Sequence, residues 1–215
     1  MEQGQQAATE PSPASGGPRT SRGQATAARL RAAARQVFGE LGYAAARVED
    51  ITAAAGVSHG TFYTYHENKA AVLDALLDET AAALRAVTEE PWDGPDPRGV
   101  VQGVIERFVD VFVGEADVIR TWLEAASHEA HFLDRLRDVR AEYVDRVAGQ
   151  LAPALRGTGH DPTIAAGALV AMVEGYATQR VDVADDGARD AAVTTLAELW
   201  FGGIARLTLR PAGID

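Results

Sequence analysis

The stretch from Gly56 to Lys69 reads Gly-Val-Ser-His-Gly-Thr-Phe-Tyr-Thr-Tyr-His-Glu-Asn-Lys and predicts a tight turn followed by a short, aromatic-rich helix. Gly56 tolerates the left-handed backbone that ends many helices, and the Ser58 hydroxyl can accept hydrogen bonds from the first free amides of the next helix. The preceding segment, Val48 to Ala55, has apolar residues at helical spacing. Two helices across such a turn predict a helix-turn-helix, whose second helix enters the DNA major groove with its first residues.

The pattern Gly-Val-Ser-x-Gly-Thr-Phe-Tyr-x-Tyr, followed by Asn-Lys and an apolar helix, resembles the signature of the TetR family of bacterial one-component repressors. The segment before it fits the first helix of that family through Thr26, Leu30, Ala33, Ala34, Val37, Phe38 and Gly42-Tyr43. The resemblance covers about Arg22 to Leu76. His66 departs from the pattern, because the family usually has Phe there, and Arg47 stands where Thr is common.

The resemblance implies an all-α fold of nine helices in two domains. We expect residues 1–21 to form a disordered tail, because they are rich in Gln, Ala, Pro, Ser and Gly and contain no aromatic residue. Residues 22–68 are expected to form a three-helix helix-turn-helix domain, and residues 69–215 a helical domain for effector binding and dimerisation. Helical periodicity predicts the later helices at about Arg98 to Val113, Ala116 to Ser127, Phe132 to Leu155, Pro162 to Val181 and Ala188 to Leu209.

The composition restricts the classes of protein and site that are possible. The chain has 215 residues, 47% of them hydrophobic, with no apolar run long enough to span a bilayer and no signal peptide pattern, so a cytoplasmic location without membrane contact is expected. The absence of cysteine excludes disulfides, thiolate chemistry and zinc-cysteine sites. We expect no cofactor and no enzymatic activity.

The charges are divided unevenly along the chain, whose formal net charge is −11. From Arg19 to Lys69 there are 7 basic and 4 acidic residues, whereas residues 70–215 contain 13 basic and 25 acidic residues. A duplex would therefore attract the first region and repel the second. This distribution favours DNA binding through one end of the molecule.

The resemblance implies a set of DNA contacts. Four positions of the reading helix match family positions that face base edges or the flanking phosphates, namely His59, Gly60, Thr61 and Tyr63. Thr26, Arg47, Tyr65 and Lys69 match positions that contact the DNA backbone. Ser58 begins the reading helix and belongs to the same set, and Arg22 could reach a minor groove. The chemistry agrees, because a histidine can donate to guanine and a threonine methyl or tyrosine ring can contact a thymine methyl.

The resemblance also implies a small-molecule effector in the C-terminal domain and a homodimer that binds a palindromic operator. The last two predicted helices are apolar over much of their circumference, which favours dimerisation through them. Large side chains of the middle helices are candidates for the effector site, with ordinary core packing as the alternative: Phe108, Phe112, Trp122, Phe132, Met172 and Tyr176. His128 and Glu174 are the polar candidates.

Two other classes of function stay open. Glu124, His128 and His131 have spacings that a helix could bring together, so a small metalloenzyme is one alternative. Their pattern is not the His-Glu-x-x-His zinc motif, because two residues rather than three separate the histidines. The other alternative is an architectural DNA binder without an effector.

Overall fold

The structure is a computed structural model that describes residues 20–89, 91–92, 96–180 and 186–208. Within these residues the fold is entirely α-helical, with nine helices and no strand, and the predicted fold class is confirmed. The helices are α1 (Ser21–Ala45), α2 (Val48–Ala55), α3 (His59–Tyr65), α4 (Lys69–Val87), α5 (Pro97–Gly114), α6 (Ala116–His128), α7 (Ala130–Leu155), α8 (Pro162–Arg180) and α9 (Asp186–Thr208).

Side-chain caps explain where several helices begin. Thr20, Ser58, Asn68 and Asp96 each accept a hydrogen bond from the backbone N–H three residues later, at 2.9 to 3.1 Å. Such a cap satisfies one of the amides that the first turn of a helix leaves without an internal partner. The starts of α1, α3, α4 and α5 are therefore set by residues that lie next to them in the sequence.

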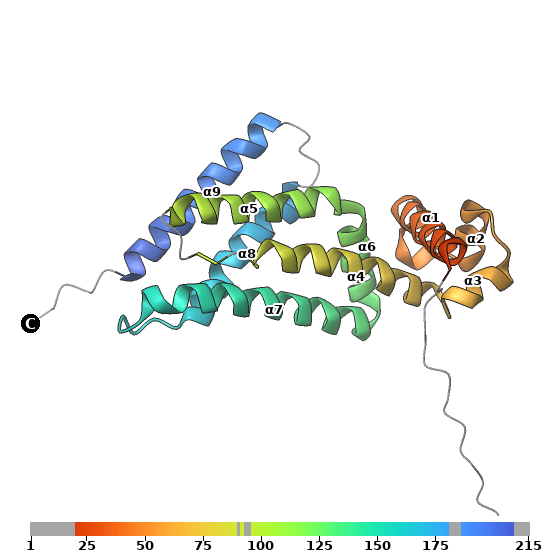
Figure 1. The fold of residues 1–215 in the computed structure, drawn as a ribbon, viewed down its shortest axis with the longest axis horizontal. Helices are drawn as coiled ribbons and strands as arrows, with labels where there is room; N and C mark the ends of the chain where they lie inside the picture. The colour runs from red at the N-terminus through yellow and green to blue at the C-terminus, as the bar shows by residue number, and fades with distance from the viewer. Residues whose placement is uncertain (1–19, 90, 93–95, 181–185, 209–215) are drawn as a thin grey trace, which may run out of the picture.

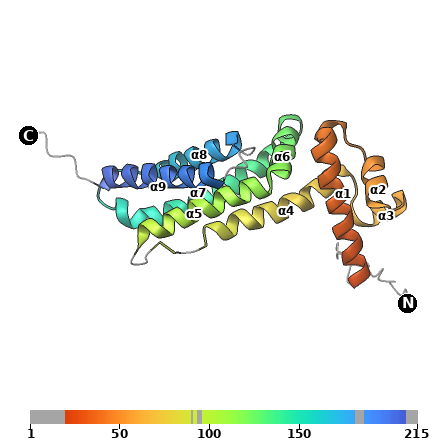
Figure 2. The same ribbon diagram turned by 90° about the horizontal axis from the view of Figure 1, so that it is seen from above.

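The helices form an elongated molecule with two parts (Figure 1). We call α1 to α3 the head and α4 to α9 the body. The head lies at one end, α1 runs across the long axis of the body, and α4 leads from the head into the body (Figure 2). One continuous hydrophobic core runs from Leu30 in α1 to Trp200 in α9, so the two parts are packed together. The predicted domain boundary at residues 68 and 69 coincides with the start of α4 and stays a prediction.

The structure differs from the expected element ends in a few places. Thr20 and Ser21, expected in the tail, cap and begin α1, whereas residues 1–19 of that predicted tail lie outside the described residues. The predicted ends of the last two helices, at Val181 and Leu209, also lie outside them. Pro153 lies within the last turns of α7.

The surface of the body carries apolar side chains at the outer helices. Ile164 on α8 is 74% exposed and Leu199 on α9 is 58% exposed. Among the described helices, none combines the length and the apolar character that a membrane crossing requires.

Candidate nucleic-acid interface and effector pocket

The turn between α2 and α3 has the geometry that its sequence predicts. Gly56 adopts φ 62° and ψ 41°, and its N–H donates to the Ala53 carbonyl at 3.2 Å. The guanidinium of Arg29 on α1 donates to the carbonyls of Ala55 and Gly56 at 2.8 and 3.3 Å. Arg29 thus holds the end of α2 from outside the motif. Sequence reasoning missed this role, because the bond spans 26 residues.

The first turn of α3 is open to solvent. His59 and Gly60 are exposed, and Tyr63 is 57% exposed. The Ser58 hydroxyl accepts from the Thr61 N–H at 3.1 Å and lies 2.9 Å from the Thr61 hydroxyl. Phe62 is fully buried beneath this surface, so one face of α3 anchors the helix and leaves the other free.

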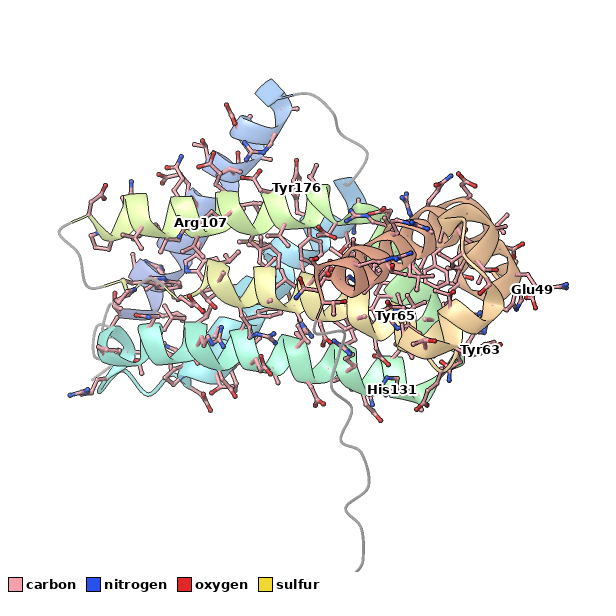
Figure 3. The ribbon with its side chains drawn as sticks, turned by 45° about the vertical axis from the view of Figure 1, so that its right-hand side comes forward. Glu49, Tyr63, Tyr65, Arg107, His131 and Tyr176 are labelled. Atoms are coloured by element: carbon pink, nitrogen blue, oxygen red, sulfur yellow. The ribbon has the colours of Figure 1, made fainter. Side chains whose placement is uncertain are left out.

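The other predicted DNA contacts lie on neighbouring parts of the head. Arg22 is exposed in the first turn of α1, and Thr26, one turn later, donates its hydroxyl to the Arg22 carbonyl at 3.0 Å. Arg47 is exposed at the start of α2, whereas Tyr65 is half-buried at the end of α3. Figure 3 shows Tyr63 and Tyr65 on the head, far from Tyr176 on the body. The DNA contacts of these residues stay predictions.

Lys69 has bonds that the sequence did not predict. Its ammonium donates to the carbonyls of Tyr43, Ala44 and Ala46 at 2.7, 3.1 and 3.0 Å, and lies 4.5 Å from the centre of the Tyr43 ring. Three carbonyls can use all three of its N–H donors. Lys69 therefore stabilises the end of α1 and Ala46, which follows it, and its predicted phosphate contact has to compete with this role.

Glu124 on α6 binds the same segment from the other side. Its carboxylate accepts from the N–H groups of Tyr43 and Ala44 at 2.9 and 3.0 Å, and these bonds lower the pKa of Glu124. Gly42 has φ 77°, and a Cβ there would lie 3.0 Å from the nearest Glu124 oxygen. A glycine is needed at this position for both reasons.

Other side-chain contacts join α1 to both ends of α6. The Arg35 guanidinium donates to both carboxylate oxygens of Asp117 at 2.7 Å and to Glu115 at 3.0 Å. The bond from Arg35 lowers the pKa of Asp117 against the opposing effect of burial. The Tyr43 hydroxyl donates to Glu129 at 2.8 Å, and burial followed by this bond raises the pKa of Tyr43. Helix α6 is thus fixed to the head along its length.

The alternative metal ligands Glu124, His128 and His131 do not form a metal site among the described residues. Glu124 is bound to the end of α1, whereas Nε2 of His131 lies 2.9 Å from Asp74 on α4. Asp74 also accepts from Arg135 at 2.7 Å, so its charge is already paired. No group of three potential ligands that could hold a metal ion occurs among the described residues. The metalloenzyme alternative loses its basis, because Glu124 and His131 have separate partners on different helices.

The body contains a cavity of about 450 Å³ between five helices. Three of the predicted effector residues line it, namely Phe112, Trp122 and Glu174. The other lining residues are Leu84 on α4, Ile119 and Leu123 on α6, Leu136, Val139, Arg140 and Tyr143 on α7, and Ala171, Gly175, Thr178 and Gln179 on α8. The cavity is largely apolar, as sites for small organic molecules generally are.

The remaining effector candidates lie elsewhere. Phe108 lines a separate apolar cavity of about 20 Å³, and Phe132 is fully buried, with its carbonyl accepting from the Trp122 indole at 3.0 Å. His128, Met172 and Tyr176 line neither cavity. Met172 and Tyr176 are directed away from the cavity that Glu174 lines. Each lies two residues from Glu174 on α8, and residues two apart on a helix differ in direction by about 200°.

Two polar side chains of α7 meet Glu174 in the cavity. Its carboxylate accepts from Nε of Arg140 at 2.9 Å and from the Tyr143 hydroxyl. Burial, followed by the charge of Glu174, raises the pKa of Tyr143. Sequence reasoning missed Arg140 and Tyr143, although their spacing of three residues, next to Leu136 and Val139, could have indicated a shared helix face.

The head matches a known family of proteins. Residues 30–76 match the pattern of bacterial regulatory proteins of the tetR family. Two curated relatives from Pseudomonas putida, the HTH-type transcriptional regulator TtgR and the probable HTH-type transcriptional regulator ArpR, are each 31% identical over 122 residues. The match covers 55% of this chain and only 57% of the length of either relative.

Solved structures resemble nearly the whole fold. The fatty acid degradation regulator FadR from Bacillus halodurans superimposes with a TM-score of 0.70 at 22% identity, over 83% of this chain and 95% of its own. FadR from Bacillus subtilis, solved in complex with stearoyl-CoA, gives 0.68 at 22% identity, over 82% and 98%. A tetR-family regulatory protein from Rhodococcus RHA1 gives 0.67 at 21% identity, over 83% and 96%. The sequence of residues 30–76 is thus similar to that of bacterial regulatory proteins of the tetR family, and the fold of the described residues is that of these solved regulators.

Proposed function

We propose that this protein is a homodimeric DNA-binding transcriptional repressor that a small apolar or aromatic molecule releases from a palindromic operator. The observation that carries the proposal is the first turn of α3, where exposed His59 and Gly60 follow a capped start and Phe62 anchors the opposite face. Exposed polar side chains at the start of a rigid recognition helix are what base reading requires.

The distribution of charge supports approach to DNA through the head. The mildly basic region of residues 19–69 contains the head, whereas the rest of the chain is strongly acidic. Because phosphates attract the first and repel the second, the head is the end that meets a duplex. Arg22, Thr26, Arg47, Tyr65 and Lys69 are proposed to contact the backbone, and His59, Gly60, Thr61 and Tyr63 the bases or adjacent phosphates.

Dimerisation through α8 and α9 is supported by exposed apolar surface. These helices lie together on the side of the body opposite α4 (Figure 2), where Ile164 and Leu199 are largely exposed. Ala168, also exposed on α8, is small enough to let another helix approach closely. A twofold dimer would present two heads to operator half-sites about 34–36 Å apart.

Helix α6 offers a route from the cavity to the head. Asp117 and Glu124 lie seven residues apart, about two turns, and hold the head from one face of α6. Ile119, Trp122 and Leu123 line the cavity from the opposite face. A ligand that binds more tightly when α6 is shifted would therefore change the placement of the heads. Release from DNA requires that the ligand has different affinities for the two positions of α6.

Selection of binding sites from random duplexes, followed by sequencing, tests the DNA-binding part of the proposal. We expect one palindromic motif for the full chain, and a relaxed preference at one base position in each half-site for His59→Ala. An unchanged motif for His59→Ala would refute the base contact, and the absence of any motif would refute the regulator proposal. Thr64→Ala is a matched control, because Thr64 is an exposed residue of α3 whose hydroxyl bonds to the Gly60 carbonyl.

Sedimentation of the full chain tests the dimer. At micromolar concentration we expect the mass of two chains, and Ile164→Glu combined with Leu199→Glu should give one chain, because each change introduces like charges across a twofold interface. A monomer for the unaltered protein would contradict the proposed dimer.

A further inference from the structure

The polar corner of the cavity has spare acceptor capacity at Glu174. The hydrogen atoms of the Tyr143 hydroxyl and the Arg140 Nε group are both directed to Glu174. An ionised carboxylate has about four acceptor sites, so two bonds leave about two of them free. The Tyr143 oxygen keeps lone pairs as well. Glu174 can therefore accept a hydrogen bond from a bound molecule.

We propose that the effector is an uncharged, largely aromatic molecule whose hydroxyl group donates a hydrogen bond to Glu174. This inference rests on the proposed function, because it specifies the chemistry of the same effector site. The hydroxyl supplies the donor that the carboxylate can still accept, and the apolar part of the molecule replaces water along the cavity wall. A phenol has both parts in one small, rigid molecule.

The charges at this corner disfavour an ionised effector. A carboxylate ligand would meet the negative charge of Glu174, and Arg140, the one cationic residue among the described lining residues, is already paired with that charge through Nε at 2.9 Å. A cationic ligand at Glu174 would be repelled by the adjacent charge of Arg140. Since the pair is close to neutral as a whole, a neutral donor is the group that binds without breaking it.

The shape of the cavity sets the place of the aromatic part. The volume of about 450 Å³ is within the range of sites for small organic ligands, and Phe112, Trp122 and Tyr143 supply aromatic walls. The neighbouring cavity of about 20 Å³, which Tyr143 also lines, holds little more than one water molecule. The ligand is therefore confined to the larger cavity, beside Glu174.

Calorimetric titration with three probes of one shape tests the proposal on the full chain. The probes are 4-phenylphenol, its methyl ether and biphenyl-4-carboxylate, which differ only in the polar group. We expect the phenol to bind at least about tenfold more tightly than the ether, because a hydrogen bond to a charged group contributes about 1.5–3 kcal/mol. The carboxylate should bind most weakly.

Glu174→Gln provides the sharper test, because it leaves the side chain its shape and frees Arg140 from its ion pair. The preference for phenol over ether should shrink, and binding of the carboxylate should improve, so that the order of the two polar probes reverses. Glu198→Gln is the matched control, since Glu198 also pairs with an arginine, Arg98, at 3.1 Å but lies outside the cavity lining. The control should keep the order of the unaltered protein.

Three outcomes would overturn the inference. They are equal affinities for phenol and ether, tightest binding of the carboxylate by the unaltered protein, and no binding of any probe. Thermal unfolding of both variants establishes that they are folded before titration. The proposed regulator function is judged separately by binding-site selection, so that a protein that selects an operator but binds no phenol refutes only the effector chemistry.

Discussion

The start of α3 in the head and the polar side chains around Glu174 in the body are held by bonds that span very different lengths of sequence. At the start of α3, the decisive bond joins Ser58 to Thr61, three residues away. In the cavity, Glu174 accepts from Arg140 and Tyr143, which lie 34 and 31 residues away. The start of α3 is therefore specified by neighbouring residues, whereas the proposed effector site forms only once α7 and α8 are packed. The end of α1 depends on contacts of both ranges, because the backbone departs from helical geometry at Gly42 and the next residues are held by Lys69 and Glu124 from distant helices.

The largest expected effect concerns the anchor of the reading helix. Phe62→Ala should lower the free energy of unfolding by about 3–5 kcal/mol, because it leaves a cavity at a fully buried aromatic side chain. Tyr63→Ala, at the neighbouring exposed position, should change stability by no more than about 0.5 kcal/mol yet weaken operator binding. Urea unfolding and DNA titration check the pair, and equal losses of stability would contradict the division of α3 into an anchored and a free face.

The contact between α6 and the head should be the next largest. Glu124→Ala should lower the free energy of unfolding by about 2 kcal/mol, because it removes a charged acceptor from two backbone amides. Hydrogen exchange of the Tyr43 and Ala44 amides should accelerate with it. Glu142→Ala is the control, since its 3.5 Å pair with Arg85 lies at the surface and should contribute about 0–1 kcal/mol. Unchanged exchange at both amides would show that Glu124 does not hold the segment.

A substitution of Lys69 can distinguish a structural role of this residue from a DNA-binding role. Lys69→Met should lower the free energy of unfolding by about 1–2 kcal/mol through the loss of its bonds to three carbonyls. If the predicted phosphate contact also forms, the slope of log affinity for DNA against log salt concentration should fall by about one. A lower stability with an unchanged salt slope would leave Lys69 with the structural role alone.

The smallest effect is a pH dependence inside the head. Burial, with the nearby charge of Arg31, lowers the pKa of His66 from its usual value near 6.5. The unfolded chain therefore takes up a proton at higher pH than the folded one, so the stability present above the unfolded pKa declines as the pH falls from about 6.5 through the folded pKa. His66→Phe should remove this part of the decline, as urea unfolding between pH 5 and 7.5 can establish; an identical decline in the variant would assign it to other groups.

The accuracy of the sequence-based predictions follows the same division by range. The bounds of α2, the left-handed Gly56 and the Ser58 cap were all predictable, because each depends on residues within a few positions. The partners of Lys69 and Glu124 were not predictable. Nothing in the sequence around either charged residue indicates that it binds backbone atoms 25 or 80 residues away. The same limit explains why Met172 and Tyr176, which line neither cavity, were predicted, whereas Arg140 and Tyr143, which line the larger one, were not.

The sequence alone determined the helical class, the order of the helices and the motif that begins at Gly56, because capping, turn geometry and apolar periodicity act over one or two helical turns. Only the tertiary structure decided which side chains meet across helices. It joined Glu124 to the end of α1, separated His131 from Glu124, and brought Arg140 and Tyr143 to Glu174. These contacts depend on the relative placement of whole helices, which is fixed by the packing of their apolar faces and not by the spacing of polar residues along the chain.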